Sequence, residues 1–116
     1  MYQIEERPPH DTTEVASREK LLEMVQPFAD DYRFCLEGFT AWEDDRPGDR
    51  VQGVFLQVDT HIGPWCIGAI IRCNDGKLRF WPREEGEKGP FSGSVAFQKR
   101  HLAAIVFQMV DQFTAR

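Results

Sequence analysis

The sequence predicts a single α+β domain, a two-layer sandwich in which two helices pack on one face of an antiparallel four-strand meander. Three observations lead to this prediction. Apolar residues recur with a helical period in two segments, one near each end of the chain. Between these segments the period changes to two over four consecutive stretches separated by turn residues. A chain of 116 residues forms one hydrophobic core, so we expect one domain over residues 1–116.

The N-terminal part is expected to hold a short strand and the first helix. Apolar side chains alternate at residues 2–4, which predicts a short fifth strand before the meander. The first helix is expected over about residues 13–26, and its apolar stripe contains Leu21, Val25 and Phe28. Pro27 is expected to end or kink this helix, because proline lacks the backbone donor that a helix needs.

Four strands are expected to follow, over residues 33–42, 51–60, 65–73 and 77–81. Gly38 suggests a bulge in the first strand. The charged stretch Glu43–Arg50 contains Pro47 and Gly48, which predicts a loop.

The third strand is apolar on both faces, which is typical of a central strand covered on both sides. Strict alternation puts Trp65, Ile67, Ala69 and Ile71 on one face, and Cys66 and Ile70 on the other. Trp65 is expected in the core because this is the most apolar strand.

The sequence Asn74-Asp75-Gly76 is the strongest turn signal in the chain. It predicts a type I turn that closes on a left-handed glycine. In the returning strand, Leu78 and Phe80 are expected to face the core and Trp81 to face away from it.

The last helix is predicted by the best amphipathic stripe in the sequence. Its members are Leu102, Ile105, Val106, Met109, Val110 and Phe113. The preceding residues, 83–94, are rich in glycine, proline and charge, and are expected to form a surface loop. Ser94 or Ser92 is expected to cap the helix, which then runs to about Phe113. Phe107 is expected to extend the packed surface.

Composition excludes several classes of partner. The chain has 14 basic and 19 acidic residues, a net charge of −5, and scattered cations, so direct nucleic-acid binding is not expected. An apolar run of about 18 residues is absent, as is a secretory signal, so no membrane association is expected. The cysteine count of three does not suit a disulfide framework and favours the cytoplasm. Dispersed cysteine and histidine residues predict neither a metal site nor a cofactor.

The candidate partner-binding residues are two tryptophans at strand ends and the carboxylates that flank them. They are Trp42, Glu43, Asp44, Asp45, Asp49, Trp81, Glu84 and Glu85. Exposed tryptophan buries a large area on binding, and carboxylates attract a cationic partner. Two alternatives remain open: the tryptophans belong to core layers, and the acidic loops are solvated or bind a divalent cation through oxygen.

We therefore expect a non-catalytic protein-binding module. Small, acidic α+β domains without a catalytic motif are typical of stoichiometric inhibitors, including immunity proteins that neutralise a toxin by direct binding. A basic nuclease toxin is the expected partner. The alternative is a small enzyme or ligand-binding domain that uses polar groups near His61, such as Asp59, although nucleophilic catalysis needs a base and an orienting group that the spacing does not require. A mimic of DNA is disfavoured by the low density of carboxylates. The oligomeric state stays open.

Overall fold

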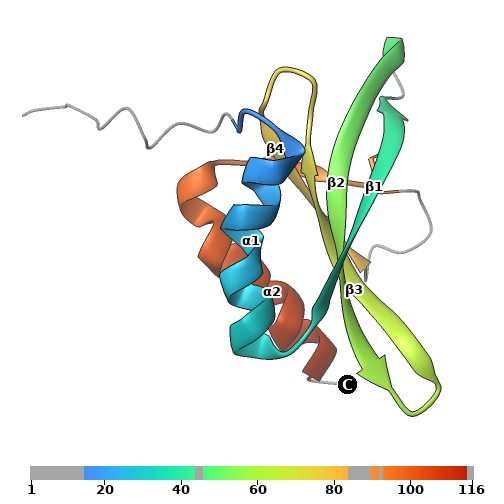
Figure 1. The fold of residues 1–116 in the computed structure, drawn as a ribbon, viewed down its shortest axis with the longest axis vertical. Helices are drawn as coiled ribbons and strands as arrows, with labels where there is room; N and C mark the ends of the chain where they lie inside the picture. The colour runs from blue at the N-terminus through green and yellow to red at the C-terminus, as the bar shows by residue number, and fades with distance from the viewer. Residues whose placement is uncertain (1–14, 44–45, 84–89, 92, 115–116) are drawn as a thin grey trace, which may run out of the picture.

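The fold is an α+β sandwich in which two helices cover one face of an antiparallel meander, as predicted, and the meander has five strands where four were expected (Figure 1). The computed structural model describes residues 15–43, 46–83, 90–91 and 93–114, and in this range the side chains of residues 41–50 and 114 are not described. The elements are α1 (Arg18–Tyr32), β1 (Cys35–Glu43), β2 (Arg46–Thr60), β3 (Gly63–Arg72), β4 (Leu78–Pro82), β5 (Val95–Phe97), the short 3₁₀ helix η3 (Lys99–His101) and α2 (Leu102–Thr114). The strand predicted at residues 2–4 lies outside the described residues.

Helix α1 begins later than predicted and does not end at Pro27. Its N-cap is Ser17, whose side-chain oxygen accepts a hydrogen bond from the backbone nitrogen of Lys20 at 3.3 Å. Pro27 lies inside the helix on the exposed side, where water can bond the carbonyl that loses its partner. Burial of Ala29, which is 3% exposed, holds the last turns in place.

The segment before α1 is tied to the far end of β3. The guanidinium of Arg72 donates to the carbonyl oxygens of Val15 at 2.7 Å and Ala16 at 2.8 Å. The backbone nitrogen of Val15 also donates to the carbonyl oxygen of Gly76 at 2.6 Å. These bonds join residues far apart in the sequence and fix where the first helix starts above the sheet.

Strand β2 is longer than predicted, because the expected loop at residues 43–50 is mostly strand. Glu43 pairs with Arg46, and the register then shifts before Trp42 pairs with Arg50. Pro47 lies within this shift and before the residues of β2 that pair with β3. Its lack of a backbone N–H group therefore removes no hydrogen bond between β2 and β3. The bulge predicted at Gly38 is wrong, because the pairing of β1 with β2 is continuous there.

Strand β3 contains a bulge that exchanges its two faces. Leu56 pairs with Gly68 and Gln57 with Cys66, so Ile67 is an extra residue. The face assignments predicted by strict alternation are therefore wrong for the first half of the strand. Ile67 joins Ile70 in the core beneath the helices, while Cys66 packs on the opposite face.

The turn after β3 confirms the prediction from Asn74-Asp75-Gly76. Gly76 has a φ of 85°, and its nitrogen donates to the carbonyl oxygen of Cys73 at 2.9 Å. The side chain of Asp75 accepts a hydrogen bond from the nitrogen of Lys77 at 3.0 Å. In β4, Leu78 is buried beneath the helices and Trp81 lies on the other face, as the alternation predicted.

The fifth strand and the start of α2 differ from the prediction. Residues 95–97 form β5, and α2 begins only at Leu102, so Ser94 does not cap it. Ser94 instead accepts a hydrogen bond from Nε of Arg79 at 2.7 Å and donates one to the carbonyl oxygen of Phe91 at 2.6 Å. The guanidinium of Arg79 also lies 5.1 Å from the centre of the Phe91 ring. These contacts hold Phe91 against the sheet face that the helices leave uncovered.

Two apolar clusters lie on the two faces of the sheet. The main core lies between sheet and helices, and from α2 it includes Leu102, Ile105, Val106 and Met109, which confirms the predicted stripe. Phe107 does not belong to it, because its side chain is 56% exposed. The second cluster lies on the outer face of the sheet and consists of Val51, Ala69, Ile71, Cys73 and Trp81, with partly buried Phe39, Phe55, Cys66 and Phe91 packed against it.

We predict that Ile105→Ala and Val106→Ala each lower the free energy of unfolding by about 1–4 kcal/mol, because both remove buried methyl groups and leave a cavity. Ile105 is 8% exposed and Val106 is 0% exposed. Gln108→Ala, on the exposed side of the same helix, is the matched control and should change stability by less than about 0.5 kcal/mol. Urea unfolding followed by circular dichroism measures all three. Wild-type stability in both core variants would contradict the packing of α2.

A second prediction compares two glycines of β3. A Cβ atom at Gly68 would collide with the sulfur of Met109 and lie 2.9 Å from the carbonyl oxygen of Trp81, whereas one at Gly63 meets open space. Gly63 has a φ of 114°, so Gly63→Ala should lower the free energy of unfolding only by the backbone strain, about 1–2 kcal/mol. Gly68→Ala should be more destabilising, because α2 must also move away from the sheet. Equal melting temperatures for the two variants would contradict the close approach of Met109.

Candidate functional site

Of the predicted partner-binding residues, the structure describes the side chain of Trp81 alone. Asp44, Asp45, Glu84 and Glu85 lie outside the described residues, and only the backbone is described for Trp42, Glu43 and Asp49. Because neighbouring strands are antiparallel throughout the meander, β1 and β4 end at opposite ends of the sheet. The backbone of Trp42 near the end of β1 and that of Trp81 near the end of β4 therefore lie apart.

The pairing register gives the size of this separation. Trp81 is level with Ala69, Phe55 and Glu37 across the sheet. Trp42 is about 17 Å further along β1, at 3.4 Å per residue, and β1 is about 14 Å from β4 at 4.8 Å per strand. Trp42 and Trp81 are thus roughly 20 Å apart.

Trp81 is buried and Trp65 is exposed, so only Trp65 differs from what the sequence predicted. Trp81 is 6% exposed, so it belongs to a core layer, which was one of the two alternatives for it. Its ring meets Phe55 edge to face, with ring centres 6.4 Å apart, and its Nε1 has no hydrogen-bond partner within the described part of the chain. Trp65, expected in the core, is 37% exposed. The guanidinium of Arg83 lies between the two, 5.7 Å from the Trp65 ring and 5.9 Å from the Trp81 ring.

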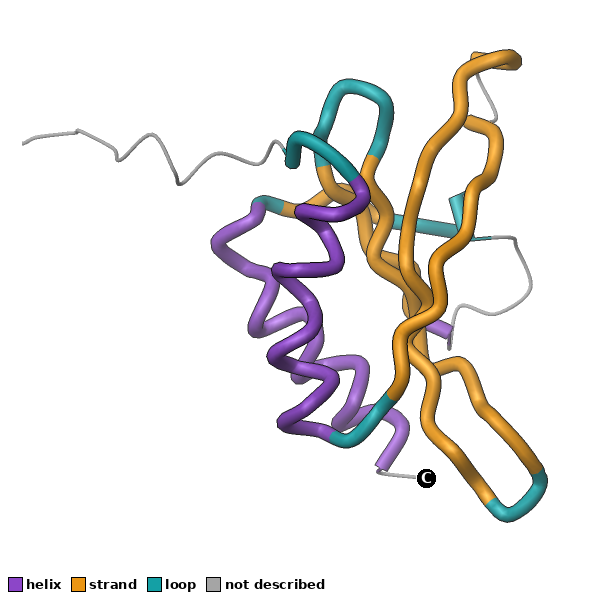
Figure 2. The backbone as a smooth tube through the Cα atoms, viewed as in Figure 1, coloured by secondary structure: helices purple, strands orange, loops and turns teal. Residues whose placement is uncertain are grey.

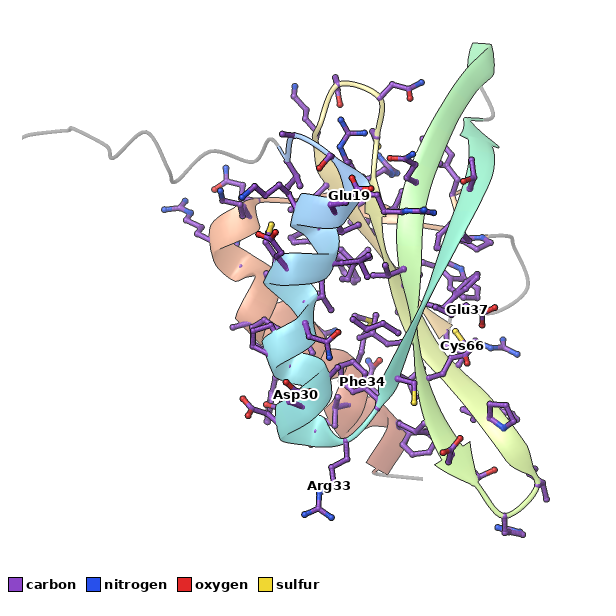
Figure 3. The ribbon with its side chains drawn as sticks, in the orientation of Figure 1. Glu19, Asp30, Arg33, Phe34, Glu37 and Cys66 are labelled. Carbon is purple, nitrogen blue, oxygen red and sulfur yellow. The ribbon has the colours of Figure 1, made fainter. Side chains whose placement is uncertain are left out.

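The outer face of the sheet also carries a small polar group around Cys66 (Figure 3). Nε2 of Gln57 donates to Oε1 of Glu37 at 2.8 Å, and Sγ of Cys66 contacts the carbonyl oxygen of Gly68 at 3.4 Å. Burial raises the pKa of the Cys66 thiol. The hydrogen bond with the backbone of Gly68 and the positive charge of Arg83 lower this pKa, but their effect is smaller. This thiol stays protonated at neutral pH, which makes it a poor nucleophile.

Asp59 and His61, the polar pair of the catalytic alternative, lie exposed near the turn between β2 and β3. A cavity of about 460 Å³ lies elsewhere, between α1 and η3, and is lined by Val15, Ala16, Lys20, Glu23, Met24 and Lys99. Lys20 and Glu23 in its wall form an ion pair at 3.3 Å. In the described ranges, no three His, Cys, Asp or Glu side chains are grouped closely enough to hold a metal ion.

The end of the β2–β3 hairpin extends beyond its neighbouring strands. From Val58 to Cys66 its two strands pair only with each other, because β1 pairs with β2 as far as Gln57 and β4 pairs with β3 from Gly68. This two-strand extension projects away from the helices, as Figure 2 shows at the lower right. We call residues 58–66 the hairpin tip.

The hairpin tip has a hydrogen-bonded turn and presents two large exposed apolar side chains. The hydroxyl of Thr60 donates to the carbonyl oxygen of Gly63 at 2.7 Å and accepts from the nitrogen of Ile62 at 3.2 Å. Ile62 is 74% exposed, and Trp65 lies nearby in the first residues of β3. From the sequence, residues 58–60 and 65–66 were expected only as strand ends, and Ile62 was not singled out. An isoleucine in a turn of otherwise small or polar residues was the signal that could have drawn attention to it.

Comparisons with protein-family models, curated proteins and solved structures found no match to this chain. Across the described residues, no helix is long and apolar enough to span a membrane.

The three cysteines lie in the described part of the chain, and none forms a disulfide. We predict that alkylation of the native protein labels exposed Cys35 first and buried Cys73 only after unfolding. Because burial raises the pKa of Cys66, its thiolate forms at higher pH in the folded chain than in urea, and its labelling rate should rise later with pH. Peptide mass spectrometry after timed labelling measures each site. Equal rates for Cys66 at neutral pH in native and urea-unfolded protein would contradict this environment.

Proposed function

We propose that this chain is a non-catalytic protein-binding module: an acidic stoichiometric inhibitor or immunity protein that acts by occluding a basic partner, such as a nuclease toxin, in the cytoplasm. The observation that carries the proposal is the hydrogen-bonded hairpin tip with exposed Ile62 and Trp65. A projecting apolar tip fits a cleft in another protein, and burying one such side chain stabilises a complex by about 1.5–3 kcal/mol.

Carboxylates near the tip support a cationic partner. Asp59 lies on the tip itself, and Asp30 and Asp31 lie in the last turn of α1. This turn is close to the base of the tip, because the chain passes from α1 through Arg33 into β1, whose first residue pairs with Gln57. All three carboxylates are exposed, and the whole chain carries a net charge of −5. Such an arrangement speeds the encounter with a basic protein.

The first test of the proposal uses the apolar tip. Capture on the immobilised chain from a lysate of the native host identifies a candidate, and titration calorimetry with the purified candidate should give one-to-one binding. Ile62→Ser and Trp65→Ala should each weaken that binding by tenfold or more, since about 1.4 kcal/mol of apolar contact is lost. Val95→Ser is the matched control, because Val95 is 53% exposed on β5 and away from the tip. Unchanged affinity in both tip variants would overturn the role of the tip.

A second test separates the two sets of carboxylates. Replacing Asp30, Asp31 and Asp59 by Ser should slow association most at low salt, where screening is weak, and leave the melting temperature nearly unchanged. The set expected from the sequence, Asp44, Asp45, Glu84 and Glu85, is replaced by Ser in a parallel variant. Stopped-flow association rates decide which set attracts the partner. Rates unchanged in both variants at low and high salt would remove electrostatic attraction from the proposal.

A further inference from the structure

The solvent side of α2 carries no charged residue between its first and last turns. Ala103, Ala104, Phe107 and Gln108 are all exposed there, and the Phe107 side chain is 56% exposed. Phe107 was expected to pack inward, yet the stripe of Leu102, Ile105, Val106 and Met109 already fills the core side of the helix. An exposed phenylalanine beside two alanines is an apolar patch that the described fold leaves uncovered.

Opposite charges lie at the two ends of this patch. Arg100 in η3 is exposed one turn before Ala104, and Asp111 is exposed one turn after Phe107. Nε of Arg100 donates to Oε1 of Gln98 at 2.8 Å, which leaves the terminal nitrogens of the guanidinium able to donate elsewhere. A carboxylate such as Asp111 accepts several hydrogen bonds at once.

The sequence positions make the patch complementary to itself. If two copies of α2 pack antiparallel about a two-fold axis midway between Ala104 and Phe107, then Ala104 of each copy faces Phe107 of the other. The same axis sets Arg100 of each copy opposite Asp111 of the other. Alanine leaves room for the opposing ring, and each cation meets an anion, as an interface between identical surfaces requires.

We infer that this chain forms a symmetric dimer through α2, with the Phe107 rings packed against Ala104 and with two Arg100–Asp111 ion pairs at the ends. The contact from Arg100 to Asp111 is only about 16 Å long at 1.5 Å per residue, so the interface is at the small end of specific interfaces. The dimer therefore dissociates on dilution. The hairpin tip is not part of this interface, so a dimer presents two tips.

Sedimentation equilibrium of the full chain over a wide range of protein concentration tests the inference. We expect the mean mass to rise from that of the monomer to twice that value. Phe107→Ser, Arg100→Glu and Asp111→Arg should each move the midpoint to a concentration at least about tenfold higher. The double variant with Arg100→Glu and Asp111→Arg should bring the midpoint back, because the ion pairs form again with reversed polarity.

The double variant distinguishes direct pairing from a loss of stability, since damage to the fold by either change would add rather than cancel. Val95→Ser, an exposed apolar change away from α2, should leave the midpoint unchanged, and circular dichroism checks that each variant is folded. A monomer at every concentration overturns the inference, as does a dimer unaffected by Phe107→Ser. A double variant no better than the single reversals overturns the ion pairs. None of these outcomes depends on the tip or its partner.

Discussion

The arrangement of the molecule depends on the burial of β3 on both faces. Every residue from Ile67 to Ile71 is buried, and the strand lies in the middle of the sheet. One side must be covered by α1 and α2, and the other by the aromatic cluster around Trp81. The bulge at Ile67 makes this arrangement work, since it turns one more large side chain toward the helices and leaves Gly68 where Met109 approaches. If either the helices or the aromatic cluster were removed, water would contact an apolar face of β3, because this strand has no polar face.

The sequence was sufficient where a structure is decided locally. The stripe of α2 and the turn at Gly76 were both predicted, because spacing along one helix and a left-handed glycine act within a few residues. The bulge in β3 could not be found in this way. Positions 66 and 67 both carry apolar side chains, Cys66 and Ile67. A bulge that shifts the strand by one residue therefore puts no polar side chain on a buried face, and the sequence pattern does not indicate the bulge. The exposure of Trp65 near the end of the strand depends on where neighbouring strands stop, which composition does not encode.

The sequence does not fix the relative positions of the two tryptophans, for a related reason. Carboxylates beside Trp42 and Trp81 look alike along the chain, yet a meander places the ends of its first and fourth strands far apart. The short strand β5 was missed because residues 95–97 follow a serine and glycine stretch that also suits a helix cap. The hairpin tip depends on where β1 and β4 end relative to β2 and β3, so only the register shows that residues 58–66 project alone.

The position of α2 after all five strands affects how the chain is made. During synthesis the meander emerges from the ribosome before α2, and its contacts are mostly between neighbouring strands, which favours early pairing. Until Leu102 and Met109 have emerged, Ile67 and Ile70 face solvent on the half of the sheet that α2 will cover. The nascent protein thus passes through a stage in which one apolar face of the sheet is uncovered. Slow translation near the end of the message would lengthen this stage, during which chaperones can bind the apolar face or the chain can aggregate.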